Sequence, residues 1–492
     1  MNCNSHLFDQ LPAEARLALT RRQLFGHGGS VAGAAALSSL IGDTFAQASS
    51  SEGKPVLPHF AAKAKNIIYL HMVGGPSQID LYDYKPKMVA MYDKDLPDSI
   101  RNGQRLTGMT SGQARFPVAP SKFKFTQEGQ CGLWMNTELL PYTAKSVDDM
   151  AFIRSMNTDA INHEPAITAM QTGSQVGGRP CIGSWLSYGL GSVNKNLPSF
   201  VVLNATPSKG GGVQAISGKL WSSGFLPGEH AGVSFRSAGD PILYINNPEG
   251  VTSTMRRRQL DGLNQLNQMA FEKLGDPDTH TRIQQYEMAF RMQASVPDLT
   301  DISKESARTF ELYGEEAKKP GSFANSALMA RRLTERGVRF VQIYLNGWDQ
   351  HGDVGGKLPA QCKDIDQATH ALIEDLKQRG LFESTLIIWG GEFGRTIYSQ
   401  GGLSHENYGR DHHPRCFTMW MAGGGVKGGT IHGETDDFSY NVVKDPVHVR
   451  DFHATALHLL GIDHERFTYR AQGLDFKLTG VEPAQVVKQV LA

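Results

Sequence analysis

The feature that most constrains the fold is a series of short apolar runs separated by helical stretches. The runs span residues 66–73, 152–154, 200–203, 338–345, 385–389 and 417–421. Asp364–Arg379, which precedes the fifth run, carries apolar residues at helical spacing. Helices that alternate with buried strands indicate a parallel sheet covered on both faces. We therefore expect an α/β protein whose active site lies beyond the carboxyl ends of its strands.

Residues 208–317 interrupt the alternation of strands and helices. Residues 208–250 are irregular and rich in glycine, which favours a loop or a small β insertion. Residues 251–317 are charged and mostly helical, and the basic triplet Arg256–Arg258 lies near their start. The triplet is typical of a solvated helix face, with an anion contact as the alternative. We expect one large domain over residues 60–480 that contains this insertion.

The N-terminal residues have the three parts of a secretory signal. The pair Arg21-Arg22 precedes a weakly apolar run at residues 31–41, and Ala46-Gln47-Ala48 has the small-x-small pattern of a cleavage site. Paired arginines before such a run indicate the twin-arginine export route. We predict a signal peptide over residues 1–48, the twin-arginine machinery as a partner, and a mature protein in the periplasm or outside the cell. A chance arginine pair before an amphipathic helix is the alternative.

The composition excludes several other classes of protein. The chain has 49 basic and 49 acidic residues, so no net charge attracts nucleic acid. We expect no transmembrane segment in the mature chain, because no stretch there has the roughly 20 apolar residues that a membrane helix needs. The four cysteines after the signal form no Cys-x-x-Cys pair, which argues against a thiolate zinc cluster, and their spacing leaves disulfides open. They are Cys131, Cys181, Cys362 and Cys416.

Carboxylates and imidazoles gather next to three of the apolar runs. Asp349 and His351 follow the fourth run, and Glu392 follows the fifth. His412 and His413 lead into the sixth. If these groups meet at one edge of the sheet, they offer the ligand types found in zinc, manganese and iron sites. The sequence therefore predicts a divalent-metal site made of these five residues, with zinc, manganese or calcium as the ion.

Each of these groups also has an interpretation without chemistry. Asp349 could cap a helix, and His351 could be an ordinary loop histidine. Glu392 could form a structural ion pair with Arg395, and residues 411–413 could be a surface loop. The metal site is favoured because all three groups occur at ends of predicted strands.

A fourth polar segment, Asn162-His163-Glu164-Pro165, has the pattern of a helix start. Proline suits the first turn of a helix, and Asn162 or His163 would cap it. The free N–H groups of a helix start favour an anion. His163 could therefore face a phosphate or sulfate group or a metal, and a capping residue without chemistry is the alternative.

Six motifs occur in a fixed order along residues 60–480. They are His71-Met-Val-Gly-Gly-Pro-Ser77-Gln-Ile-Asp80, Asn162-His163-Glu-Pro, Gly347-Trp-Asp-Gln-His351, Gly391-Glu-Phe-Gly-Arg395, Gly409-Arg-Asp-His-His-Pro414 and Asp451-Phe-His-Ala-Thr455. As a set they resemble the sulfatase-like branch of the alkaline phosphatase superfamily known as domain of unknown function 1501. The resemblance implies a three-layer α/β/α sandwich with a central, mostly parallel sheet. It also implies chemistry on phosphate or sulfate esters with one or two metal ions and a nucleophile at a helix N-terminus.

The sequence departs from the sulfatase pattern at the position of the nucleophile. Spacing read back from Thr172-Gly173 puts His163 where sulfatases carry their essential cysteine. Pro165 is kept, but Ala166-Ile167 stands where that motif has serine and arginine. By this resemblance, His163 is a candidate ligand, general acid/base or nucleophile, and Ser77 is a reserve nucleophile.

Two functions fit these observations. The first is an exported, metal-dependent hydrolase that acts on a phosphate or sulfate ester of a small molecule or polysaccharide. The alternative is a non-catalytic binding or scaffold protein on the same fold, which the missing nucleophile favours. An oxidoreductase is disfavoured, because the glycine-rich segments at 210–212 and 423–425 lack the strand and helix of a dinucleotide-binding motif.

Overall fold

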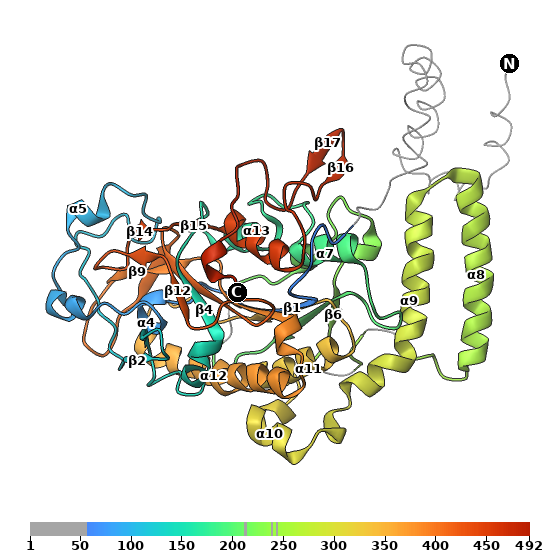
Figure 1. Ribbon diagram of the computed structural model, residues 1–492, viewed down its shortest axis with the longest axis horizontal. Helices are drawn as coiled ribbons and strands as arrows, with labels where there is room; N and C mark the ends of the chain where they lie inside the picture. Colours follow the sequence, from blue (N-terminus) through green and yellow to red (C-terminus); the bar gives the residue numbers. More distant parts are fainter. Residues whose placement is uncertain (1–56, 211–213, 238–239, 243–244) are drawn as a thin grey trace, which may run out of the picture. The chain divides into compact units, whose positions relative to one another are not determined.

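A nine-stranded sheet forms the centre of the structure, a computed structural model that describes residues 57–492 except 211–213, 238–239 and 243–244 (Figure 1). The strand order is β12-β4-β11-β8-β1-β7-β5-β6, and β15 pairs with β4. These strands are β1 Asn66–Met72, β4 Met150–Asn157, β5 Phe200–Ala205, β6 Val233–Phe235, β7 Phe340–Leu345, β8 Thr385–Gly390, β11 Phe417–Ala422, β12 Thr430–His432 and β15 Val447–His448. The predicted signal at residues 1–48 lies outside the described residues.

The sheet is mostly parallel, as predicted. β1 pairs in parallel with both β7 and β8, and the parallel pairing continues through β5 to β6. Within the described ranges β11 is the exception, because it runs antiparallel to both of its neighbours, β8 and β4. The residues that enter β11 therefore lie at the same edge as the carboxyl ends of the other strands.

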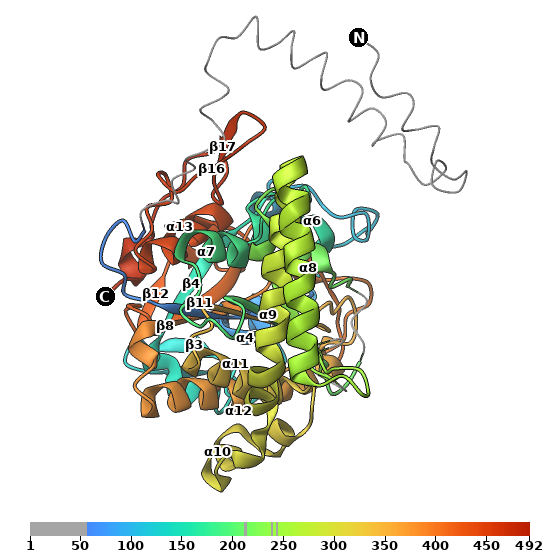
Figure 2. The same cartoon turned by 90° about the vertical axis from the view of Figure 1, so that its right-hand side faces the viewer.

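Helices cover both faces of this sheet (Figures 1 and 2). α11 (Phe323–Glu335) and α12 (Val354–Gln378) pack on one face. α6 (His163–Thr172), α7 (Ile182–Leu190) and α13 (Val449–Leu459) pack on the other. The predicted three-layer α/β/α sandwich is confirmed by this arrangement.

The side chains of β1 show how the sheet separates two hydrophobic cores. Ile68 and Leu70 belong to the core beneath α11 and α12. Ile67 and Tyr69 belong to the core beneath α7 and α13. Successive residues of a strand point to opposite faces, so an unbroken apolar run is what a strand buried on both sides requires.

The remaining helices and strands lie in the connections. They are α4 Gln78–Leu81, α5 Asp98–Arg101, α8 Ser253–Leu274, α9 Pro277–Thr300, α10 Ala307–Tyr313, and the antiparallel pairs β2 Thr126–Glu128 with β3 Leu133–Met135, β9 Gly394–Ser399 with β10 Arg410–His413, β13 Glu434–Thr435 with β14 Val442–Lys444, and β16 Tyr469–Ala471 with β17 Leu474–Phe476. The cysteines Cys131, Cys181, Cys362 and Cys416 are free thiols. No helix in the described ranges is long and apolar enough to cross a membrane.

The segment predicted as an insertion, residues 208–317, contains a helical hairpin and a strand. α8 and α9 lie side by side as an antiparallel pair (Figures 1 and 2), and β6 adds a parallel strand to the sheet. Arg257 of the basic triplet joins the two helices, because its guanidinium nitrogens lie 2.6 and 2.9 Å from the carboxylate oxygens of Glu287. This arginine therefore has a structural role in the hairpin.

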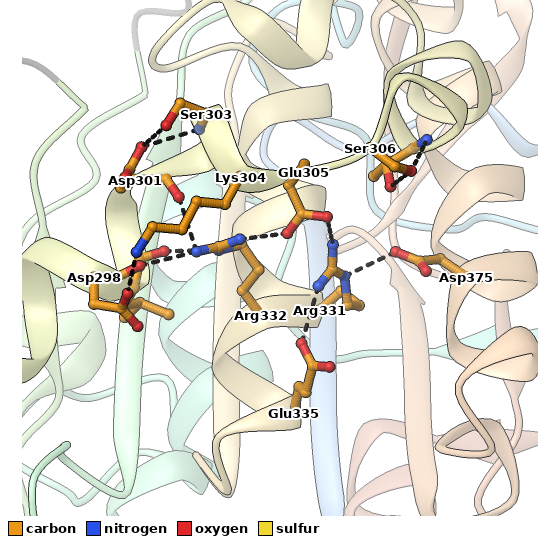
Figure 3. Close-up of polar contacts among 12 residues, drawn as sticks. Asp298, Asp301, Ser303, Lys304, Glu305, Ser306, Arg331, Arg332, Glu335 and Asp375 are labelled. Carbon is orange, nitrogen blue, oxygen red and sulfur yellow. Dashed lines mark hydrogen bonds and ion pairs between the residues drawn. The ribbon is translucent and has the colours of Figure 1, made fainter.

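A network of ion pairs and hydrogen bonds fixes the end of α9 and the segment that follows it to the helical layer (Figure 3). Arg332 of α11 donates to the backbone carbonyl of Leu299 at 2.7 Å. Its neighbour Arg331 lies 2.7 Å from Glu305 and 2.8 Å from Asp375 of α12. The two arginines are almost fully buried, so their charges need these partners.

Candidate metal centre

Three connections bring polar side chains to the carboxyl edge of the sheet. β7 ends at Leu345 and is followed by Asp349 and His351, and β4 leads to His163 at the start of α6. His412 lies in β10, which enters the antiparallel strand β11 at the same edge. The direction of β11 therefore explains why residues that precede a strand join residues that follow other strands.

The four side chains form one compact group. One ligand atom from each of His163, Asp349, His351 and His412 lies within 4.8 Å of all the others. The Nε2 atoms of the three histidines lie 3.1, 2.9 and 3.6 Å from Oδ1 of Asp349, for His163, His351 and His412 respectively. His163 and His412 are buried, whereas Asp349 and His351 are partly exposed, which leaves the group open to solvent on one side.

The other nitrogen of each histidine meets an oxygen acceptor. Nδ1 of His163 lies 2.6 Å from Oε1 of Glu392, and Nδ1 of His412 lies 2.8 Å from the carbonyl of Ile161. Nδ1 of His351 lies 2.6 Å from Oε1 of Gln400. Acceptors at these positions place the hydrogen on Nδ1, so each neutral ring presents the lone pair of Nε2 to the group.

The inward-facing atoms are therefore three nitrogens, each with a lone pair, and one carboxylate oxygen. These atoms repel one another unless a cation lies among them. Nε2 of His163 and Nε2 of His412 are buried without a hydrogen-bond partner. A proton on Nε2 is one cation that relieves the repulsion: burial lowers the pKa of His163, but the carboxylates of Asp349 and Glu392 favour the charged ring and raise that pKa above its usual value. A divalent metal is the other, because it accepts several such donors at once.

Asp349 is held in place and kept ionised. Arg395, a fully buried arginine, donates to Oδ1 at 2.7 Å, and Gln214 donates to Oδ2 at 2.9 Å. Burial raises the pKa of Asp349, but the three histidines that face it and the charge of Arg395 hold it well below its usual range. The residue that caps α12 is Asp353, so Asp349 does not act as the cap of that helix.

Glu392 lies behind His163 and outside the group of four. Its Oε1 accepts from Nδ1 of His163 and, at 2.9 Å, from the backbone N–H of Gly74. Its other oxygen lies 3.6 Å from Nε2 of His71. Burial raises the pKa of Glu392, but the hydrogen bond to His163 and the nearby His71 keep it below its usual value. A carboxylate behind a ligand histidine fixes the ring and strengthens it as a donor.

The structure does not bring His413 to the group. His412 and His413 are neighbours in β10, so their side chains point to opposite sides. Nε2 of His413 lies 2.6 Å from the carbonyl of Tyr440, and its ring stacks on the Tyr440 ring. Burial lowers the pKa of His413 to about 4.

Ser77 also lies outside the group, in a buried ion-pair network. Its hydroxyl donates to Oδ2 of Asp80 at 2.6 Å. The same carboxylate oxygen lies 2.6 Å from Nε of Arg410, and both charged side chains are fully buried. This network gives Ser77 a structural partner and no contact with the four clustered residues.

Three groups that shape the centre carry no signal in the sequence. Gln400 and Ile161 orient two of the histidines, and Gln214 binds the free oxygen of Asp349. All three lie in irregular connections or at their ends. Their roles depend on contacts between distant parts of the chain, which residue type and spacing do not report.

A sandwich with a group of three histidines and one aspartate at its carboxyl edge defines an α/β protein with a candidate metal centre. Residues 64–491 match the family described as "Protein of unknown function (DUF1501)", and the chain belongs to this family. No curated protein matches the sequence.

Solved structures with a similar course of the chain include three hydrolases. PsFucS1 sulfatase from Pseudoalteromonas sp. is 14% identical, covers 82% of this chain and 68% of its own, and has a TM-score of 0.34. Alkaline phosphatase from the Antarctic bacterium TAB5 is 12% identical, with 74% and 92% covered and a TM-score of 0.29. Phosphonate monoester hydrolase from Silicibacter pomeroyi is 9% identical, with 81% and 73% covered and a TM-score of 0.29. These scores lie below 0.5, so the fold is assigned from the sheet and its layers.

Proposed function

We propose that this chain is a metal-dependent hydrolase of a phosphate or sulfate ester. One observation carries the proposal: the Nε2 lone pairs of His163, His351 and His412 face one oxygen of Asp349. Such a set of donors is suited to a divalent metal at the open edge of an α/β sheet. The six ordered sequence motifs, which resemble those of the sulfatase-like branch of the alkaline phosphatase superfamily, support a phosphate or sulfate ester as the substrate.

The donor set favours zinc or manganese over calcium. Imidazole nitrogen is a good ligand for zinc and also occurs in manganese sites, whereas calcium prefers six to eight oxygen ligands. Glu392 would orient His163 from behind. His413 is left out of the proposed ligand set, because its Nε2 lies at the Tyr440 carbonyl.

A divalent metal at this position would act as a Lewis acid on an ester oxygen. His163 has Nδ1 occupied by Glu392, so its one remaining nitrogen is the one that faces Asp349, and we assign His163 as a ligand. Among the described residues, no hydroxyl or thiol side chain forms a hydrogen bond with the four clustered side chains. We therefore assign water as the nucleophile, and Arg395 and Gln214 as the residues that hold Asp349 in position.

We also propose that the protein is exported by the twin-arginine route and acts in the periplasm or outside the cell. The arginine pair, apolar run and cleavage pattern in residues 20–48 support this. A fusion of residues 1–50 to a reporter that is active only after twin-arginine export tests it. Replacement of Arg21-Arg22 by two lysines should abolish export, and unchanged export would contradict the proposal.

The experiment for the hydrolase is metal analysis combined with turnover. Protein purified in native form, and an Asp349→Ala variant, would be assayed for metal content and for hydrolysis of 4-nitrophenyl phosphate, 4-nitrophenyl sulfate and bis(4-nitrophenyl) phosphate. We expect about one metal per chain and turnover of at least one ester, both lost in the variant. A metal-loaded chain without turnover would favour the non-catalytic alternative, and a chain that takes up no metal would contradict both the centre and the activity.

A further inference from the structure

A pocket of about 410 Å³ opens beside the candidate metal centre. Its wall includes Ile161, whose carbonyl accepts the hydrogen bond from Nδ1 of His412. His413, the next residue in β10, also lines it. The pocket therefore adjoins the centre through the loop before α6 and through strand β10, in which His413 lines the pocket and its neighbour His412 faces the centre.

The pocket carries two arginines without protein partners. Arg105 and Arg415 line it, and both are exposed. Neither has an ion pair or a hydrogen bond with another described residue. This sets them apart from the arginines that build the fold, such as Arg395 and Arg410, whose guanidinium groups are buried against carboxylates and carbonyls.

The acidic residue in the wall does not cancel this charge. Asp159 also lines the pocket, but its carboxylate lies 3.1 Å from Nε2 of His448 and 3.7 Å from Arg450. The other polar groups of the wall include the side-chain amides of Gln104 and Asn157, and Oε1 of Gln104 is buried without a hydrogen-bond partner. The pocket thus combines two free guanidinium groups with neutral amides, which is a setting for an oxyanion that also carries hydroxyl groups.

We propose that this pocket is a subsite for an oxyanion, a sulfate, phosphate or carboxylate group, on a hydroxyl-rich ligand. Two arginines that line one pocket offer paired N–H donors, which suit the planar or tetrahedral oxygens of such groups. If the metal centre hydrolyses an ester, its substrate is an extended one that bears a second anionic group, such as a polyanionic carbohydrate. That last step rests on the proposed function, whereas binding of the anion does not.

Isothermal titration calorimetry with defined disaccharides tests the subsite. The probes are a disaccharide with one sulfate and one uronate carboxylate, the same disaccharide without the sulfate, and lactose as the neutral control. The variants are Arg105→Gln, Arg415→Gln and their double, with Arg470→Gln as a matched control, because Arg470 is exposed in β16 and does not line the pocket. Metal content is measured on the same samples, and His351→Ala serves as the variant that lacks a metal ligand.

We expect the wild-type chain to bind the charged disaccharides more tightly than lactose. Each arginine variant should weaken this binding about tenfold, as expected for loss of a hydrogen bond to a charged group. Arg470→Gln should leave it unchanged, and His351→Ala should keep the preference for the charged disaccharides over lactose. Equal binding by wild type and the double variant, or no preference over lactose, would overturn the subsite. If wild type holds no metal but binds the probes through the arginines, the proposed function fails while the subsite stands.

Discussion

Nε2 of His163 and Oδ1 of Asp349 lie 3.1 Å apart, although the neutral ring carries its hydrogen on the opposite nitrogen. The pair is stable only if a cation lies between the two atoms or a proton joins them. His351 and His412 present the same nitrogen to the same oxygen. The metal centre is thus inferred from the direction in which the hydrogen bonds run around it, and each of those bonds can be altered separately.

Replacement of Glu392 by glutamine should weaken metal binding without unfolding the protein. The amide keeps an oxygen that can accept from His163 but loses the charge that strengthens the ring as a donor. We expect zinc affinity to fall by about tenfold, as is common for residues behind metal ligands, measured by competition with a chromogenic chelator. Glu434→Gln, which removes an exposed carboxylate 3.0 Å from Lys444, is the control. Equal affinity in wild type and Glu392→Gln would contradict the role of Glu392.

Replacement of Gly74 by alanine should disturb the centre through the backbone. Gly74 has a φ of +121°, and a Cβ there would lie 2.3 Å from the backbone nitrogen of Asp349. The segment that carries Asp349 must shift, so we expect loss of metal binding and destabilisation by about 1–3 kcal/mol. Thermal unfolding and metal content measure the two effects. Gly112→Ala, where a Cβ meets nothing within 4 Å, should behave like wild type.

The buried pair of Asp80 and Arg410 predicts an asymmetry between single and double variants. Their side chains are fully buried and lie 2.6 Å apart. Arg410→Met leaves a buried carboxylate without its partner, which costs about 3–5 kcal/mol. The double variant Asp80→Asn with Arg410→Met should recover much of this loss in urea unfolding. A double variant as unstable as Arg410→Met would show that the pair is not the cause.

The ion pairs of Glu305 should make the stability of the folded protein depend on pH (Figure 3). Burial raises its pKa, but hydrogen bonds from Arg331 and Arg332 outweigh burial and lower the pKa below its ordinary value of 4.5. A lowered pKa in the folded state adds stability above pH 4.5, and this is lost as the pH falls through the folded pKa. Glu305→Gln should therefore be less stable than wild type at pH 7, and the gap should narrow toward pH 3. Glu383→Gln, an exposed site, should show no such gap.

The central strands could be predicted from the sequence because burial on both faces leaves an unbroken apolar run, as in residues 67–70 of β1 and 386–389 of β8. The first part of α12 could not be predicted from the sequence. That helix begins at Val354, ten residues before the stretch with helical spacing. Its first turns contain Gly355, Gly356 and Pro359, which have low helix propensity, so the sequence does not indicate a helix there. Its position is fixed by packing on the sheet, which overrides the weak helix propensity of those residues.

The sequence predicted which types of residue form the site and that they lie at the ends of strands. It did not predict the direction in which each side chain points. His412 and His413 looked equivalent, because the segment Arg410–His413 has no apolar residue to mark it as a strand. Once it is a strand, alternation sends the two rings to opposite sides. The placement of Glu392 behind His163 depends on a contact across 229 residues, which spacing along the chain does not report.

Anomalous diffraction from crystals of the natively purified protein tests the metal centre most directly. We expect one peak at the absorption edge of the bound metal, about 2.0–2.2 Å from Nε2 of His163, His351 and His412 and from Oδ1 of Asp349. The peak should be absent in Asp349→Ala crystals. An ordered group of four side chains with no peak after soaking with zinc and manganese, or a peak at another place, would contradict it.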